Sequence, residues 1–404
     1  MESRSRALYN QVFDDKLFAE YEHYLATRAG PFGFRLAETP LFLSRALRDR
    51  LKSDALAICA ELSIPETLAK MKQAIPERFD APNMTALPEC VQVDFALIEN
   101  ANGELEGKVV ELQGFPSLYA LEVMMADAWR ETLASRPNLD RDWTCLFDLD
   151  RKAGIERIAR LLTAGEDPEH VAMLDLDPEA QKTWPDFAAT KLFFGIEPTS
   201  ALHVIKRGNK LFRVDASSGG RKEIPIKRIY NRLVFDELEV KKITLPFSWK
   251  DDLDVTWCAH PNWYWTWSKY SLPFLNHPAV PKTRFLSEVK TLPEDLSRYV
   301  MKPLFSYAGA GVVVDVTPDA VARVPEADRH NFILQEKVAY ANAITMPSGA
   351  GVKAEVRIML MADGNHHVPI LPLVRLSRGK MLGVDYNRGQ DWVGGTVGIW
   401  DSEV

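Results

Sequence analysis

The 404 residues include 46% hydrophobic side chains, enough to bury a large core, and this predicts a globular protein of two or three closely packed lobes. The formal net charge is −7, from 56 acidic and 49 basic residues, and the sequence has no basic tract of the kind that binds nucleic acid. An anionic ligand must therefore be met by local cations.

The four cysteines are widely spaced and form no CxxC pair, which argues against a disulfide framework and against a zinc site. They are Cys59, Cys90, Cys145 and Cys258. The N-terminal sequence lacks the basic-then-apolar order of a signal peptide, and no apolar run is long enough to cross a bilayer. We therefore expect a soluble protein of the reducing cytoplasm.

The first part of the chain has a helical pattern. From about Asp14 to Lys72 the apolar residues recur three and four positions apart. This predicts an α-rich N-terminal segment over residues 1–85, whose expected role is packing.

The pattern changes to strands at Cys90. The run CVQVDFALIEN, the turn ANGELEG and the run KVVELQGFPSL predict a β-hairpin, and Leu118 to Leu133 resumes a helical pattern. Glu111 and Gln113 are two positions apart, so on a strand they share one face, and Asp94 lies on the partner strand. Three oxygen donors so placed can hold a hard cation such as magnesium. The alternative is a solvated sheet face.

Strands interleaved with helices over residues 170–232 predict a small α/β lobe with parallel strands. Asp177 lies where one of these strands ends and a helix begins, on the side where such sheets bind ligands. Arg232 follows the strand end IYN. Its guanidinium could anchor a carboxylate in bidentate fashion, and a surface ion pair is an equally good interpretation.

An aromatic run follows, in which Trp263, Trp265 and Trp267 alternate. Such tryptophans are more often core than a ligand platform. Lys269 comes next in an apolar context, where a lysine can either extend its ammonium to solvent or face a phosphate.

The run YVMKPLFSYAGAGVVV, from Tyr299 to Val314, predicts a hairpin with a glycine-rich loop. Gly309 and Gly311 let the backbone approach an anion closely, and Lys302 places a cation beside it. This pattern is typical of a phosphate-binding loop, although many hairpins have glycine-rich tips.

The last third of the chain supplies strands with polar ends. NFILQEKVAY predicts a strand that ends at Gln335 and Glu336, where backbone groups can meet an adenine edge and a carboxylate a ribose. AEVRIMLMADG contains Glu355 and Arg357, and PILPLVRLSRG contains Arg375 and Arg378.

A second glycine loop, Gly394-Gly395-Thr396, is predicted near the end of the chain, and it adds backbone donors for an anion.

In this order the pieces resemble the ATP-grasp ligases, and among them the circularly permuted group of eukaryotic-type glutathione synthetase and glutathionylspermidine-synthase-like proteins. Lys269, KPLFSYAGAGV, ILQEKV, AEVRIML, LVRLSRG and NRGQDWVGG keep the family order, whereas the metal-binding pieces VDFALIEN and VVELQGFPSL come first. The resemblance implies an ATP-grasp fold of the α+β or α/β class. Its core would begin over 86–165, an inserted lobe would occupy 166–268, and the nucleotide-binding part would span 269–404.

The resemblance also implies roles for individual residues. Asp94 and Glu111 look like the magnesium carboxylates, and Gln113 stands where the family has asparagine. Arg375, Lys302 and Arg232 look like catalytic residues, with Arg232 on the substrate side. The implied ATP-binding set is Lys269, Lys302, Gly309, Gly311, Gln335, Glu336, Lys337, Val338, Arg357, Gly394 and Gly395.

The sequence departs from the family at two places. Gln92 stands where these glutathione synthetases have arginine, two residues before the aspartate of the hairpin. The glycine-rich loop has Ser306 and Tyr307 but no acidic residue, whereas the family has a magnesium-binding glutamate there.

These observations together predict an ATP- and magnesium-dependent carboxylate–amine ligase. It would act through an acyl phosphate on a small amino-acid-like or peptide-like substrate, and the resemblance suggests a homodimer. Three alternatives stay open: a kinase with the same nucleotide site, a non-catalytic nucleotide-binding protein, and an α+β protein that binds no nucleotide.

Overall fold

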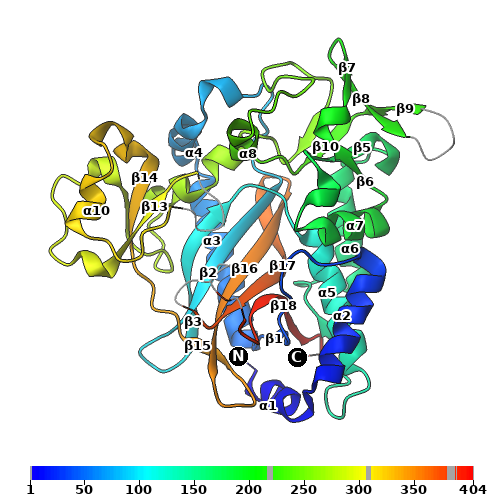
Figure 1. Ribbon diagram of the computed structural model, residues 1–404, viewed down its shortest axis with the longest axis vertical. Coiled ribbons are helices and arrows are strands. Elements are labelled where there is room, and N and C mark those ends of the chain that lie inside the picture. Colours follow the sequence, from blue (N-terminus) through cyan, green and yellow to red (C-terminus); the bar gives the residue numbers. More distant parts are fainter. Residues whose placement is uncertain (1, 216–221, 306–310, 380–386, 388, 404) are drawn as a thin grey trace.

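The computed structural model describes residues 2–215, 222–305, 311–379, 387 and 389–403 (Figure 1). In these residues an eight-stranded sheet, a four-stranded parallel sheet and two three-stranded sheets combine with helices, so the fold is mixed α+β. Within the same residues no helix has both the length and the apolar composition needed to cross a membrane.

Helices dominate the N-terminal segment, as predicted. They are α1 (Ser3–Val12), α2 (Asp15–Ala29), α3 (Arg45–Leu62) and α4 (Pro65–Met71). The helical pattern is interrupted between α2 and α3, where Pro31 and Pro40 cannot continue a helix. This segment contributes strand β1 (Leu41–Phe42), so the N-terminal residues join the main sheet.

The eight-stranded sheet lies at the centre of the molecule (Figure 1). Its main strands follow the order β1-β18-β17-β16-β2-β3, and β15 and β4 pair with β16 and β18. The bounds are β2 (Cys90–Glu99), β3 (Leu105–Gln113), β4 (Trp143–Thr144), β15 (Asn342–Thr345), β16 (Gly351–Asp363), β17 (His366–Ser377) and β18 (Gly394–Asp401). The predicted early hairpin is therefore confirmed as β2 and β3, and it pairs with strands from the end of the chain.

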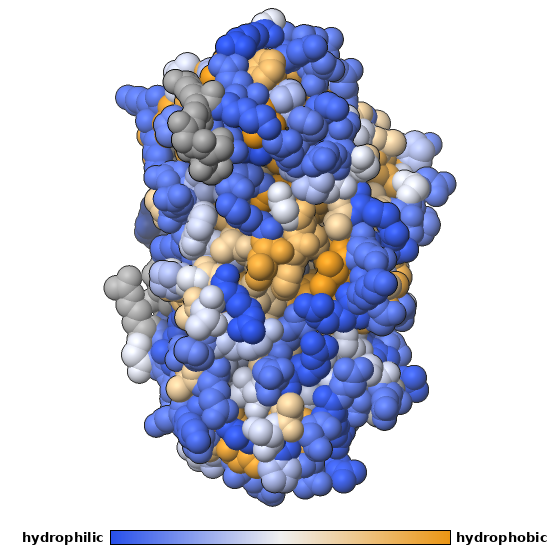
Figure 2. Space-filling view, turned by 90° about the vertical axis from the view of Figure 1, so that its right-hand side faces the viewer, coloured by the Kyte–Doolittle hydropathy of each residue, from blue (hydrophilic) through white to orange (hydrophobic). Residues whose placement is uncertain are grey.

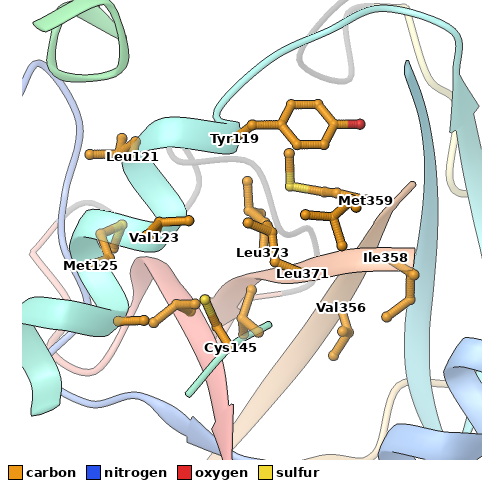
Figure 3. Close-up of a cluster of buried hydrophobic side chains, with 14 of the residues drawn as sticks. Tyr119, Leu121, Val123, Met125, Cys145, Val356, Ile358, Met359, Leu371 and Leu373 are labelled. Atoms are coloured by element: carbon orange, nitrogen blue, oxygen red, sulfur yellow. The ribbon is translucent and has the colours of Figure 1, made fainter. Parts of the chain in front are cut away.

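Helix α5 (Tyr119–Leu133) packs against the central sheet and against α2 and α7 (Trp184–Phe194), and nearly all of its side chains are buried. Figure 3 shows Tyr119 and Val123 of this helix beside Met359 and Leu373 of the sheet. Each such fully buried apolar side chain contributes about 1.5–3 kcal/mol relative to an exposed one. The helix thus fixes one end of the hairpin β2–β3 relative to the strands that follow it.

Glu122 is an exception to the apolar character of α5. It is 2% exposed, and its Oε2 atom has no hydrogen-bond partner in the part of the chain that the structure describes. Burial, reinforced by the charge of Asp186, raises the pKa of Glu122 well above its usual value of 4.5, and Arg357 opposes this only in part. The folded protein therefore disfavours the ionised carboxylate.

We expect Glu122→Gln to raise the free energy of unfolding at pH 8 by about 1–3 kcal/mol and to leave it almost unchanged at pH 4. A raised folded pKa gives stability that is complete below 4.5 and is lost as the pH rises, and the neutral amide removes that loss. Urea titrations at several pH values measure the effect. The exposed Glu131 of the same helix provides the control Glu131→Gln, and equal pH profiles for the two variants would contradict the prediction.

The small α/β lobe has the predicted parallel strands. Its sheet runs in the order β11-β10-β5-β6, and all three pairings are parallel. The strands are β5 (Val171–Asp175), β6 (Glu197–Ser200), β10 (Arg228–Asn231) and β11 (Thr256–Cys258), and the helices are α6 (Arg151–Thr163), α7 (Trp184–Phe194) and α8 (Phe235–Val240). A separate antiparallel sheet contains β7 (Ile205–Arg207), β8 (Lys210–Asp215) and β9 (Lys222–Ile226).

A second small sheet has the order β12-β14-β13 and is antiparallel. Its strands are β12 (Thr283–Phe285), β13 (Tyr299–Pro303) and β14 (Phe332–Glu336), and α9 (Trp263–Thr266) and α10 (Pro318–Ala322) lie nearby in sequence. The predicted glycine hairpin is confirmed in part. Its first strand is β13, but its return is a single bridge between Met301 and Val313.

The alternating tryptophans are core residues, as the pattern favours: Trp263, Trp265 and Trp267 are all buried. The cysteines are buried free thiols, and the sulfur atoms of Cys90 and Cys258 lie 4.0 Å apart between β2 and β11.

One face of the molecule has an apolar area. Figure 2 shows it near the middle of the side on which α2, α6 and α7 lie in Figure 1. Leu192 of α7 is 56% exposed and is one of the large apolar side chains that reach solvent.

Candidate functional site

Lys302 lies at the end of β13 and bridges the second small sheet to the central one. Its ammonium donates to the carbonyl of Val110 at 2.9 Å and to Gln335 Oε1 at 2.7 Å. Burial lowers the pKa of Lys302 to about 8; the carboxylate of Glu111 opposes this shift and the nearby Lys269 adds to it. The Lys302 side chain therefore stays largely protonated at neutral pH.

Gln335, on β14, lies opposite Val300 of β13. The amide group of Gln335 donates to Thr283 Oγ1 at 3.2 Å. The side chain thus orients Lys302. The next two backbone N–H groups are also used, because Glu336 donates to Lys282 and Lys337 to Arg298. Of the predicted adenine segment, Val338 follows the strand in a half-buried position.

The early hairpin places its polar residues on one face of the central sheet. Asp94 lies opposite Glu111, and Gln92 lies opposite Gln113, whereas Leu112 between them is buried in the core. The ammonium of Lys269, which is 9% exposed, lies 3.0 Å from Glu111 Oε1. Asp94, Glu111 and Gln113 therefore lie on one face of the sheet, as predicted.

Asp94 is enclosed by two arginines, Arg357 from the adjacent strand β16 and Arg375 from β17, the next strand of the sheet. Arg357 Nε lies 2.6 Å from Asp94 Oδ1 and Nη2 lies 2.7 Å from Oδ2, and Arg375 Nη2 also bonds Oδ2. The carboxylate side chain is only 1% exposed. Burial alone would raise the pKa of Asp94, but Arg357 and Arg375 hold it below its usual value.

Arg375 is the most exposed member of this group, at 33%. Its Nη2 atom is shared between Asp94 and Glu355, which lies 2.5 Å away, and Glu355 Oε2 accepts from the hydroxyl of Tyr340 at 3.0 Å. Burial lowers the pKa of Arg375, but Glu355 and Asp94 together raise it overall. We call Lys269, Lys302, Arg357 and Arg375 the cation cluster.

Arg232 lies beyond the end of β10 and is 95% buried, since its exposure is 5%. Its Nη1 lies 2.5 Å from Asp186 Oδ2, and Nη2 lies 3.4 Å from the hydroxyl of Ser117. Of the two interpretations of this arginine, an ion pair is the one present, although it is buried and not at the surface. Asp186 also accepts from the backbone N–H groups of Leu118 and Leu121 and so caps the start of α5.

The second glycine pair is not a loop, contrary to the prediction. Gly394 and Gly395 begin strand β18, and the N–H of Gly395 donates to the carbonyl of Arg35 at 2.9 Å. A Cβ atom on Gly394 would lie 2.3 Å from that carbonyl oxygen. These glycines therefore permit a close backbone approach, and the amide of Gly395 is already used.

The glycine-rich loop is described only at its end. Gly309 lies outside the described residues, as do Ser306 and Tyr307. Gly311 has a φ of 73°, a conformation that favours glycine.

The fold brings the cation cluster together with Asp94, Glu111, Gln113 and Gln335. Arg232 is linked to this group through Ser117, whose carbonyl accepts from Gln92. The glycines of β18 and Arg378 are not part of the group: Gly395 bonds the backbone of Arg35, and Arg378 pairs with Asp391. Sequence patterns did not identify Ser117, Asp186 or Tyr340. Glu355 belongs to a predicted strand, and its spacing of two from Arg357 is the sequence signal that both side chains share a face.

A cavity of about 890 Å³ lies next to this site, at the end of β13. Its lining includes Trp265, Tyr270, Phe305 and Phe332, together with Pro303, the residue after Lys302. The volume is in the range of small-molecule pockets. The aromatic run from Trp263 to Tyr270 is the sequence signal for it, but burial of a tryptophan in the core gives the same pattern.

The fold is similar to that of a glutathione synthetase-like effector from Globodera pallida, solved in the apo form. The TM-score is 0.57 at 13% sequence identity, and the match covers 97% of this chain and 98% of that one. No protein-family model and no curated protein matches this chain. The chain therefore has a glutathione synthetase-like fold, and the likeness at this identity concerns the fold alone.

Proposed function

We propose that this protein is an ATP- and magnesium-dependent carboxylate–amine ligase. The observation that carries the proposal is the convergence of the cation cluster, in which residues distant in sequence meet where the second small sheet contacts the central sheet. The glutathione synthetase-like fold supports it.

The reaction would proceed in two steps. The substrate carboxylate would attack the γ-phosphorus of ATP, giving an acyl phosphate and ADP. An amine would then attack the acyl carbon, so that the amide bond forms, inorganic phosphate leaves and the amine loses a proton. No nucleophilic side chain is needed, and the contribution of the protein is positioning and charge neutralisation.

The cation cluster divides naturally between these tasks. Lys302 and Lys269 would offset the charge of the triphosphate, because both ammonium groups are fixed by neighbouring oxygen atoms. Arg375, the most exposed guanidinium of the cluster, would hold the transferring phosphoryl group or the substrate carboxylate. Arg357 would not contact the substrate and would position Asp94, which in turn bonds Arg375.

Magnesium fits only part of the predicted ligand set. Asp94 does not fit, because arginines occupy both of its oxygen atoms and its side chain is almost fully buried. In the described chain no three acidic, histidine or cysteine side chains are grouped as a metal site. Glu111, which is 29% exposed although Lys269 lies against its Oε1, and the half-buried Gln113 could hold an ion that arrives with nucleotide, since magnesium often takes one or two protein oxygens together with phosphates. Bound there, the ion would offset phosphate charge.

Arg232 is proposed on the substrate side with a modified role. Asp186 already neutralises its guanidinium, so it would position Ser117 and the start of α5 and would not itself supply charge to the substrate.

The test is a screen for ADP release across amino acids and small peptides, each offered as acid and as amine, with mass measurement of the products. We expect ADP, inorganic phosphate and an amide. A stable phosphorylated product without free phosphate would indicate a kinase instead. ATP binding without turnover would indicate a non-catalytic nucleotide-binding protein, and no binding at millimolar ATP would overturn the nucleotide site itself.

A further inference from the structure

Side chains form a continuous hydrogen-bonded path across the central sheet. It begins at Tyr340, four residues beyond the end of β14, and passes through Glu355 and Arg375 to Asp94. Asp94 holds Arg357 with bonds of 2.6 and 2.7 Å. The first half of the path thus joins the segment after β14 to the deepest arginine of the cation cluster.

Gln92 continues the path toward the small α/β lobe. Its Oε1 accepts from Arg357 Nη1 at 2.8 Å, and its Nε2 donates to the carbonyl of Ser117 at 3.0 Å. The hydroxyl of Ser117 in turn accepts from Arg232 at 3.4 Å, and Arg232 pairs with Asp186. Both ends of a single amide are therefore used, one toward each part of the molecule.

The chemistry of this position requires an amide. Gln92 is fully buried, and it faces a guanidinium on one side and a carbonyl oxygen on the other. An amide both accepts and donates, whereas a carboxylate only accepts and a thioether side chain does neither effectively. A buried polar group that loses its hydrogen-bond partner destabilises the fold. A substitution of Gln92 should therefore weaken the local structure around Arg357 and Ser117.

We infer that Gln92 is a positioning residue that couples the cation cluster to Ser117, Arg232 and the start of α5. An anion that draws Arg375 toward itself changes how Asp94 is shared between the two arginines, and Arg357 passes that change to Gln92. The identity of the anion as ATP rests on the proposed function. Occupancy of the cluster would then order the small lobe before the second substrate arrives.

The first test needs no ligand. Hydrogen–deuterium exchange is compared in the wild type, Gln92→Glu, Gln92→Met and Met359→Leu. Met359 lies opposite Gln92 on β16 and makes an apolar control at the same depth. We expect the amides of residues 118–121 and 229–233 to exchange about tenfold faster in both Gln92 variants, as for one lost hydrogen bond. The control should stay within about twofold of wild type.

Gln92→Glu keeps an acceptor for Arg357 and replaces the donor to Ser117 by a carboxylate oxygen, so it remains informative even if Gln92→Met does not fold. Equal exchange in Gln92→Glu and Met359→Leu would overturn the inference, because the link would then be no more than packing.

The second test adds ATP and magnesium. In the wild type we expect slower exchange at residues 229–233. At ATP concentrations that saturate each protein, Gln92→Glu should lack this protection. Protection of equal size in the variant would overturn the coupling. Failure of the wild type to bind ATP would overturn the proposed function instead, and the ligand-free comparison would still decide whether Gln92 joins the two parts.

Discussion

Lys302→Met is expected to weaken ATP binding by about 100-fold, as measured by calorimetric titration of the variant and the wild type. Methionine keeps the length and apolar stem of the side chain but removes the charge. A charged donor contributes about 1.5–3 kcal/mol through its hydrogen bonds. Because the Lys302 ammonium is fixed by Val110 and Gln335, it costs little to present it to a phosphate.

Two variants separate this effect from damage to the fold. Gln335→Met removes one of the hydrogen bonds of Lys302 and leaves the charge, so it reports the structural part. Lys206→Met removes a lysine that pairs with Asp251 in the small lobe, at 31% exposure, and serves as the charge control. If Lys302→Met binds ATP as tightly as Lys206→Met does, the phosphate role of β13 is wrong.

Local sequence pattern was sufficient to predict secondary structure and sheet faces where the neighbours of a residue lie close in sequence. In the hairpin from Cys90 to Gln113 the alternation of apolar and polar residues shows which side chains share a face, and the turn sets the pairing from Phe95 to Glu99. A register shift between Asp94 and Phe95, which the sequence does not show, places Asp94 opposite Glu111. The parallel sheet of the small lobe follows in the same way from strands that alternate with helices.

The pairing of charges could not be predicted in this way. Asp94 reads as one of three oxygen donors on a strand face, and nothing near it in sequence shows that β16 and β17 bring Arg357 and Arg375 against it. Its role depends on the order of strands in the sheet. The same holds for Arg232, whose partner Asp186 comes from a helix on another segment.

The glycines of β18 show a further limit. A Gly-Gly pair beside polar residues suggests a turn, but the structure uses Gly394 where the carbonyl of Arg35 comes too close for a side chain. Close contact between distant backbones and the need for a flexible loop both favour glycine, so the residue type does not distinguish them.

Asp94→Ala is expected to lower the free energy of unfolding by about 3–5 kcal/mol, as measured by urea titration. The substitution leaves the buried guanidinium of Arg357 without its carboxylate, and Arg375 with Glu355 alone. Asp127→Ala is the matched control. Asp127 is also bonded by two arginines, but Arg151 and Arg130 are 42% and 37% exposed and can be hydrated, so that loss should be about 1 kcal/mol.

The sign of the Asp94 effect in metal-free buffer also distinguishes its two possible roles. A carboxylate held for a metal is repelled by the other carboxylates of its site when the metal is removed, so its replacement would leave stability unchanged or increase it. A carboxylate that neutralises two arginines gives a large loss under the same conditions. The double variant Asp94→Leu with Arg357→Met should recover most of that loss, because it leaves no buried charge unpaired while Arg375 keeps Glu355. If Asp94→Ala leaves stability unchanged or raises it in the presence of a chelator, Asp94 is a metal ligand as the sequence predicts.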